Sequence, residues 1–300
     1  MRTRKDAPAA EQAHHGASHY WLAGELGEVE LLRTRHSHHN YPRHAHEGLA
    51  CGVIESGNFG FTARGRDWIA VPRVSVVMVN PEDVHDGGPL DDGGYDYRML
   101  YIDAPLVARA MAERADRERS WTPFFPELMV DDADLARRML ALHRALEQGS
   151  EVGRLERETR FLDAITCLVS RHARERPVDD TRHGIQHRVL ARARQYLEAH
   201  VGDDVSLTEL ASASGASRFH LLRSFRRAFG LPPHAWLMQH RLHLARHLLR
   251  AGEMPVAVAA ALGFTDQSHL TRRFLALYGV TPGRYRQESN GVQALGARRP

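Results

Sequence analysis

Three histidines in the first third of the chain have side chains that can bind a metal ion or hydrogen-bond a ligand. His44 and His46 flank a single alanine, and His85 follows after several predicted strands. Imidazole is a common Zn²⁺ ligand, and three such ligands would leave one coordination position open. Histidines that line a pocket or donate hydrogen bonds are the default interpretation of this pattern. We therefore expect no bound metal and no cofactor.

A second group of side chains, near the C-terminus, suits contact with DNA. Arginine can pair with guanine and glutamine with adenine in the major groove, whereas serine and other arginines more often hold phosphates. The stretch 218–227 carries no acidic residue. The candidate DNA-binding residues are Arg218, Phe219, Leu222, Arg223, Arg227, Gln267, Ser268, His269, Arg272 and Arg273.

These candidates belong to a helical pattern that occurs twice with an offset of 49 residues. A repeat of this length is typical of a duplicated supersecondary unit. The first copy contains Leu221, Arg223, Phe225, Phe229, Gly230, Pro233 and Trp236, and the second contains Leu270, Arg272, Phe274, Tyr278, Gly279, Pro282 and Tyr285.

Each copy predicts a short helix, a glycine-containing turn and a longer helix, which is the helix-turn-helix signature. Ser206 and Glu209 form a capping-box pattern, and Ser217 can cap a helix over 218–229. Thr265 or Asp266 can cap the corresponding helix of the second copy. Between the copies, residues 233–250 predict a helix of roughly 27 Å. That length approaches one turn of B-DNA, about 34 Å, so both longer helices could enter successive major grooves.

The elements that precede this region predict a different architecture. From about residue 20 to 103, short apolar runs alternate with turn signals, which indicates a β-sandwich or barrel. From 104 to 176 the period becomes helical, with two apolar stripes that predict an antiparallel hairpin. The hairpin could cover the barrel, pair with the same hairpin of another subunit, or do both. The stripes are Leu135, Met139, Leu142 and Leu146, then Leu155, Leu162, Ile165, Leu168 and Val169.

Charge is distributed unevenly along the chain. Residues 1–182 hold 24 Lys and Arg against 30 Asp and Glu, whereas residues 183–290 hold 14 against 7. A basic second half suggests nucleic acid as its partner. No apolar run is long enough for a membrane span, no secretory signal is visible, and the two cysteines form no CxxC pair. A reducing cytoplasm, with association to the nucleoid, fits this composition.

Residues 187–286 resemble the DNA-binding domain of the AraC/XylS family of transcription regulators. The resemblance is carried by 207–211, 215–229, 261–269 and 279–285. It maps base-reading positions onto Arg218, Phe219, Leu222 and Arg223, and onto Gln267, His269 and Arg272. Leu222 departs from the pattern because polar residues are common there.

The β-region is similar to a cupin, and the β-region with its hairpin is similar to the family's N-terminal part, which implies effector binding and dimerisation. The cupin metal pattern also has a Glu four or five residues after the second His, where this chain has Ala50 and Cys51. The candidate effector-binding residues are His44, His46, Glu47, His85, Tyr97 and Arg98.

We therefore predict an α+β protein of two domains: a cupin-like jelly-roll barrel with a helical hairpin, then an all-α double helix-turn-helix domain. The expected segments are a disordered tail 1–18, the barrel 19–103, the hairpin 104–176, a linker 177–186, the DNA-binding domain 187–286 and a flexible tail 287–300.

The predicted function is regulation of transcription through promoter DNA, modulated by a small-molecule effector in the barrel. The expected partners are double-stranded DNA, an effector, a second copy in a homodimer, and RNA polymerase if the protein is an activator. A metal-dependent cupin enzyme with an accessory DNA-binding domain is the alternative, and a DNA-repair protein is a third. The repair protein would need a reactive cysteine in a metal-binding cluster.

Overall fold

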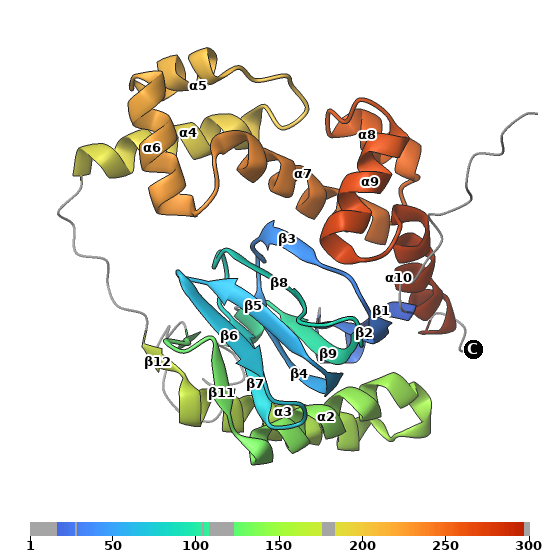
Figure 1. Cartoon of the computed structure of the whole chain (residues 1–300). Coiled ribbons are helices and arrows are strands. Elements are labelled where there is room, and N and C mark those ends of the chain that lie inside the picture. The colour runs from blue at the N-terminus through green and yellow to red at the C-terminus, as the bar shows by residue number, and fades with distance from the viewer. Residues whose placement is uncertain (1–16, 28, 104, 108–122, 176–183, 297–300) are drawn as a thin grey trace, which may run out of the picture.

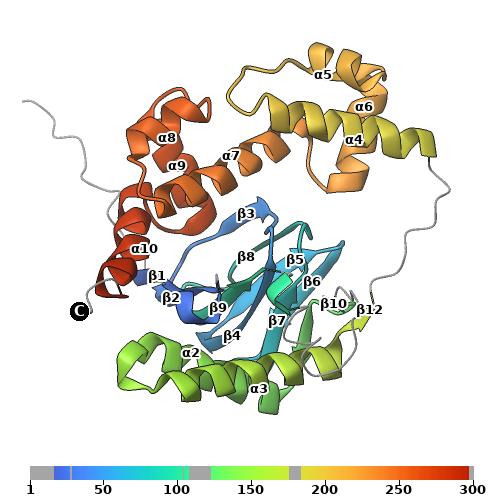
Figure 2. The ribbon, with the colours of Figure 1, turned by 180° about the vertical axis from the view of Figure 1, so that it is seen from behind.

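The computed structural model describes residues 17–27, 29–103, 105–107, 123–175 and 184–296. The described residues form three layers, with the helical hairpin on one side of a β-sandwich and the C-terminal helices on the other (Figures 1 and 2). The long helix α7 crosses the sandwich and joins the two halves of the C-terminal domain.

The sandwich has a large and a small antiparallel sheet. The large sheet has the order β1-β2-β9-β4-β7-β11, and the small sheet has the order β3-β8-β5-β6. The large-sheet strands are β1 (Ala17–Ala23), β2 (Val29–Ser37), β9 (Tyr95–Ile102), β4 (Leu49–Gly57), β7 (Ser75–Val79) and β11 (Met129–Asp131). The small-sheet strands are β3 (Tyr41–His44), β8 (His85–Pro89), β5 (Phe59–Ala63) and β6 (Arg66–Ala70). A short pair, β10 (Pro123–Phe124) and β12 (Arg174–Glu175), and two single turns, η1 (Gly24–Leu26) and η2 (Gly149–Glu151), complete this part.

Alternation along the strands divides the apolar side chains between two cores. In β9, Tyr97 and Met99 face the interior of the sandwich, whereas Leu100 and Ile102 face the hairpin. This follows from the period of two in a strand, which sends successive side chains to opposite faces. The large sheet is therefore buried on both sides.

The hairpin consists of α2 (Ala133–Gln148) and α3 (Arg154–His172). Asp132 caps α2 by accepting a hydrogen bond from the backbone N–H of Leu135 at 3.0 Å. The second predicted stripe is only partly buried, because Leu155 and Leu162 are 78% and 43% exposed. These two residues lie seven positions apart and therefore on one face of α3, which points away from α2.

The C-terminal domain contains seven helices among the described residues. They are α4 (Gly184–Ala199), α5 (Leu207–Ser214), α6 (Arg218–Phe229), α7 (Pro233–Arg250), α8 (Pro255–Ala261), α9 (Gln267–Tyr278) and α10 (Pro282–Gly296). The offset of 49 holds to the residue, since it relates both ends of α6 to those of α9 and the first residue of α7 to that of α10. Gly230 and Gly279 end α6 and α9 with φ 69°, a left-handed conformation that glycine adopts without strain. No helix in the described part is long and apolar enough to cross a membrane.

The predicted tails at both ends of the chain need a correction. The expected flexible tail 287–300 is helical through Gly296, because α10 packs beside β1. The Glu288 carboxylate accepts a hydrogen bond from the backbone N–H of Tyr20 at 3.1 Å, which ties α10 to the sandwich. At the other end, β1 begins at Ala17, within the predicted tail 1–18. Most of the predicted linker lies outside the described residues, and α4 begins at Gly184.

The two helix-turn-helix units are packed differently. The first unit has a core of its own, formed by α4 to α7 around Leu221 and Phe225. The second unit shares one continuous core with the sandwich interior, in which Phe274 and Tyr278 join Tyr20 and Tyr97. The second unit is therefore anchored on the sandwich through apolar burial, which is the main stabilising term in folding.

Candidate effector cavity and nucleic-acid interface

The helices α6 and α9 are well defined at both ends. The Ser217 hydroxyl accepts a hydrogen bond from His220 N–H at 3.3 Å, and Asp266 accepts one from His269 N–H at 2.6 Å. A side-chain oxygen at this position satisfies a backbone N–H that has no partner within the helix. Each helix thus begins at a side-chain cap and ends at a left-handed glycine.

In α6, four of the five candidate residues are exposed: Arg218, Phe219, Arg223 and Arg227. Phe219 is 76% exposed, which is unusual for a phenylalanine and leaves its ring available for contact. Leu222 is half-buried and lines a groove with Leu210 and Arg226. Leu222 therefore offers less surface to a ligand than the four exposed residues do.

In α9, Gln267, Ser268, Arg272 and Arg273 are exposed. His269 is half-buried, and its ring packs edge-on against Phe264 with centroids 5.5 Å apart. Partial burial and the neighbouring Arg273 lower the pKa of His269. This histidine is therefore neutral at pH 7 and can accept or donate a hydrogen bond.

The C-terminal ends of both helices face the sandwich. His39 Nε2 lies 3.0 Å from the carbonyl oxygen of Ala276, and the Tyr20 hydroxyl donates to the carbonyl of Tyr278 at 3.1 Å. At the end of α6, Gly230 lies against Val84. Except for Arg227, which lies in the last turn of α6, the exposed candidates lie in the N-terminal three-quarters of each helix, away from these contacts.

A cavity of about 50 Å³ lies inside the sandwich, beneath α9. Its wall contains aromatic and aliphatic side chains from both sheets, and Leu277 and Tyr278 of α9 close it. Tyr41 and Tyr97 meet there, with their hydroxyl oxygens 2.6 Å apart. The Tyr278 hydroxyl is buried and has no hydrogen-bond partner among the described residues. The cavity has room for a few water molecules, since one water needs about 10–15 Å³.

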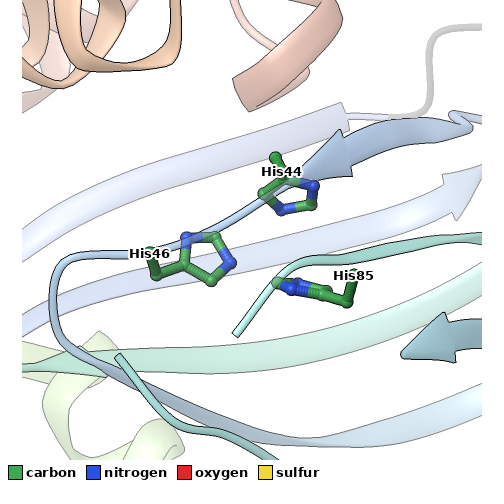
Figure 3. Close-up of side chains that lie close together, drawn as sticks. All are labelled: His44, His46 and His85. Atoms are coloured by element: carbon green, nitrogen blue, oxygen red, sulfur yellow. The ribbon is translucent and has the colours of Figure 1, made fainter. Parts of the chain in front are cut away.

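His44, His46 and His85 lie together in the wall of this cavity (Figure 3). The ring centroids of His44 and His85 are 4.2 Å apart, and that of His46 lies 4.7 Å from the first and 5.0 Å from the second. Burial lowers the pKa of all three, well below the usual value for His44 and His46. The three imidazoles are therefore neutral at pH 7.

Comparison with known protein families agrees with this two-part organisation. The family of AraC-like ligand binding domains matches residues 26–165, and a helix-turn-helix domain family matches residues 210–288. The chain belongs to the AraC family of transcription regulators. The AraC-like ligand-binding match thus covers the barrel and most of the hairpin, and the helix-turn-helix match lies in the C-terminal domain.

Two relatives differ in how much of this AraC-family chain they match. The uncharacterized HTH-type transcriptional regulator YbfI of Bacillus subtilis (strain 168) is 26% identical over 250 residues, which are 81% of this chain and 86% of the relative. The transcriptional activator NphR of Rhodococcus sp is 38% identical over 104 residues, 33% of this chain and 30% of the relative.

Solved structures show the same fold. ToxT from Vibrio cholerae O395 superposes with a TM-score of 0.55 at 11% identity, over 88% of this chain and 98% of ToxT. ToxT with a bound unsaturated fatty acid, from Vibrio cholerae strain SCE256, has a TM-score of 0.52 at 10% identity, over 88% and 95% of the two chains. At this identity the likeness concerns the fold.

Two of the predicted effector-binding residues lie outside the cavity. Glu47 faces α7, where its carboxylate accepts a hydrogen bond from His247 Nε2 at 3.1 Å. Arg98 projects from the opposite face of the large sheet and pairs with Glu55 at 2.6 Å and Glu147 at 2.5 Å. Arg98 alternates with Tyr97 along β9, so only one of the two can face the cavity. His44, His46, His85 and Tyr97 line the cavity, and their role in effector binding stays a prediction.

The sequence did not predict several cavity residues, among them Tyr20, Tyr41, Tyr101, Leu277 and Tyr278. Tyr101 could have been found, because it shares the alternation of Tyr97 and Met99 along β9. The two residues of α9 carry no local signal, since only the docking of the two domains brings them to the barrel. The interface between the two domains therefore forms part of the cavity wall.

Proposed function

We propose that the protein regulates transcription by placing α6 and α9 in successive major grooves of promoter DNA. The observation that carries this proposal is the exposure of Arg218, Arg223, Gln267 and Arg272 on helix segments that the barrel leaves uncovered. Gln267 would read adenine, whereas Arg223 and Arg272 would contact guanine or phosphate. The exposed ring of Phe219 suits the methyl group of thymine.

Replacement of Arg223 and Arg272 by Ala tests this assignment. Specific operator binding should be lost in the double variant, and each lost phosphate contact should reduce the slope of log K against log salt by about one. Arg137→Ala is the matched control, because Arg137 is exposed on α2, remote from the DNA-binding domain. Unchanged operator affinity in the double variant would refute the assignment. Genome-wide footprinting of the wild type supplies the operator and the regulated genes.

We further propose that the effector binds in the cavity and changes how α9 rests on the barrel. The cavity wall contains residues of both domains, so a ligand there contacts the barrel and α9 at once. A ligand shifts a conformational equilibrium only by its difference in affinity for the two states. A ligand larger than a few water molecules would have to displace α9. This displacement would couple effector binding to the position of the DNA-binding domain.

A variant with a filled cavity tests this effector site. Val77→Ile combined with Val79→Ile adds two methylene groups to the cavity wall with little change in shape. The variant should keep its basal operator affinity and lose the response to the effector, which can be chosen from the pathway of the regulated genes. A response that equals that of the wild type would place the effector elsewhere.

We propose that the protein forms a homodimer through α3. Leu155 and Leu162 present an exposed apolar stripe on one face of this helix, and such patches mark interaction surfaces. The variant Leu155→Glu/Leu162→Glu should be monomeric by light scattering at micromolar concentration. Ile69→Glu is the control, because Ile69 is 65% exposed on β6 of the same domain. A monomeric wild type, with and without DNA, would refute this interface.

These proposals place the protein in the cytoplasm, on the nucleoid, with RNA polymerase as a further partner if it activates transcription. We assign no enzymatic role, since the matching families are a helix-turn-helix domain and an AraC-like ligand binding domain, and the relative YbfI is named a transcriptional regulator.

A further inference from the structure

The three cavity histidines are brought together by strand register. His44 ends β3 and His85 begins β8, and the two residues are direct partners in the antiparallel ladder. Side chains of such partners share one face of the sheet, so the rings meet. His46 follows His44 by two residues and returns to the same side. As a result, one nitrogen from each ring lies within 4.8 Å of the other two.

Backbone carbonyls select the tautomer of two of the rings. His44 Nδ1 lies 2.7 Å from the carbonyl oxygen of Pro42, and His85 Nδ1 lies 3.0 Å from that of Asp83. A carbonyl only accepts, so each Nδ1 carries the proton and donates. The Nε2 atom of each ring then keeps its lone pair. This arrangement, in which a backbone carbonyl accepts a hydrogen bond from one ring nitrogen, is typical of metal-binding histidines.

Figure 3 shows the three rings turned toward one another. Unprotonated nitrogens that face one another in a buried site repel, unless a Lewis acid or a proton lies between them. Burial lowers the pKa of each ring, which disfavours the proton. Neutral imidazole is also the form that binds a metal. A cation between the rings would satisfy all three nitrogens.

We propose that His44, His46 and His85 bind one divalent ion of a late first-row transition metal, with zinc as the reference. Zinc–nitrogen bonds of about 2.0–2.1 Å place tetrahedral ligand atoms about 3.3 Å apart. Rings whose nitrogens now lie within 4.8 Å would therefore approach one another by about 1.5 Å at most.

The fourth coordination position is open toward the cavity. Ala50 faces the sandwich interior and has no donor atom, whereas Cys51 faces the hairpin core on the other side of the sheet. Neither residue can therefore complete the coordination. The cavity of about 50 Å³ suits an ion with a bound water or a small donor group of an effector.

The site is also connected to the DNA-binding domain. Ala45 lies between two of the ligands, and α7 holds both of its backbone groups. Gln239 accepts from the Ala45 N–H at 3.2 Å, and His243 donates to the Ala45 carbonyl at 3.1 Å. Movement of the rings onto an ion would shift Ala45 against α7. This coupling to operator affinity rests on the proposed function, but metal binding itself does not.

Zinc titration of the full-length, chelator-treated protein tests the site, with a competing chromophoric chelator as the readout. We expect one zinc per chain at this site, and an affinity at least about tenfold weaker in His46→Gln and in His85→Gln. His200→Ala is the matched control, because His200 is a half-buried histidine stacked on Tyr196 after α4. A His14→Ala/His15→Ala variant should also retain the site.

Two further measurements keep the test independent of folding. Cobalt should give the visible absorption of a tetrahedral nitrogen site in the wild type and not in His46→Gln. Zinc should raise the Tm of the wild type and of His200→Ala, but not that of the two ligand variants. Equal zinc affinity and equal cobalt spectra in the wild type and His46→Gln would overturn the proposal.

Operator affinity, measured with chelator and with zinc, separates the two parts of the inference. We expect a change of at least about fivefold in the wild type, the lower end of typical allosteric coupling, and none in His46→Gln. A zinc-loaded wild type with unchanged operator affinity would overturn the coupling through Ala45. The histidine variants could bind zinc as the wild type does while Arg223→Ala/Arg272→Ala still loses operator binding. That result would refute the metal site and leave the DNA-binding assignment supported.

Discussion

At the scale of single residues, His143 shows how a side chain that could do chemistry is used for structure. Its Nε2 lies 3.2 Å from the carbonyl of Leu32, and its Nδ1 lies 3.0 Å from Arg98 Nη1. An arginine only donates, so Nδ1 must be unprotonated and Nε2 carries the hydrogen. This buried ring therefore joins α2 to the sandwich only in its neutral form.

We predict that His143 makes the protein less stable in mild acid. Burial and the adjacent Arg98 lower the pKa of His143 to about 3, whereas the unfolded state titrates at about 6.5. The folded pKa is the lower of the two. The stabilisation is therefore complete above pH 6.5 and is lost as the pH falls toward 3. Between pH 7 and pH 5 the loss should be about 2 kcal/mol.

Urea unfolding of the wild type and of His143→Gln at both pH values measures this loss. Glutamine can accept from Arg98 and donate to Leu32 but does not titrate. The difference between the two proteins should therefore change with pH by the stated amount. Parallel pH profiles would show that His143 is not the titrating group.

At the scale of elements, α6 and α9, the two proposed recognition helices, are each specified by residues within or next to them. The boundaries 218–229 of α6 agree with the prediction, because a serine cap and a terminal glycine mark them locally. The short helix α5 has a complete capping box: Glu209 N–H donates to the Ser206 hydroxyl at 3.2 Å, and Ser206 N–H donates to the Glu209 carboxylate at 2.8 Å. Such local signals explain why the duplicated unit is visible in the sequence.

Loss of this cap should destabilise the first helix-turn-helix unit. Ser206→Ala removes the acceptor for Glu209 N–H and should cost about 1 kcal/mol. Ser212→Ala provides the control, because it is the same substitution at an exposed position of the same helix. Urea unfolding of the two variants gives the comparison. A cost no greater for Ser206→Ala than for Ser212→Ala would contradict the role of the cap.

At the scale of the whole molecule, a buried ion pair joins the two domains. Arg246 of α7 lies 3.3 Å from Glu30 of β2, and both side chains are largely shielded from water. The guanidinium also lies 5.7 Å from the centre of the Tyr278 ring. The barrel, α7 and the end of α9 therefore meet at this pair, close to the proposed effector cavity.

Removal of one partner of this ion pair should lower the free energy of unfolding more than removal of both partners. Arg246→Met leaves the Glu30 carboxylate buried without its cation, and such a change costs about 3–5 kcal/mol. The double variant Glu30→Gln/Arg246→Met should recover a large part of that loss, as a double-mutant cycle of unfolding would show. Arg137→Met, at an exposed surface pair on α2, should cost less than about 1 kcal/mol. Additive costs for Glu30 and Arg246 would contradict a direct pair.

The sequence by itself determined the elements and the family. Capping residues, left-handed glycines and apolar periodicity act over a few residues, so α6, α9 and most strands could be predicted. Tyr97, Arg98 and the three histidines were candidates because they are polar groups near predicted strands, and this criterion does not separate the two faces of β9. Alternation along β9 places Tyr97 toward the cavity and Arg98 on the opposite face.

Only the tertiary structure decided what surrounds the cavity. Tyr20 and Tyr278 are 258 residues apart, yet one donates a hydrogen bond to the other's carbonyl. The register of β3 and β8 decides that the three histidines converge, and domain docking decides that α9 closes their cavity. Neither the register nor the docking is marked by residues that are near in sequence, since both depend on burying surfaces formed by distant segments. For that reason, the sequence predicts α6 and α9, which we propose to read DNA, whereas only the tertiary structure shows the cavity that we propose to control them.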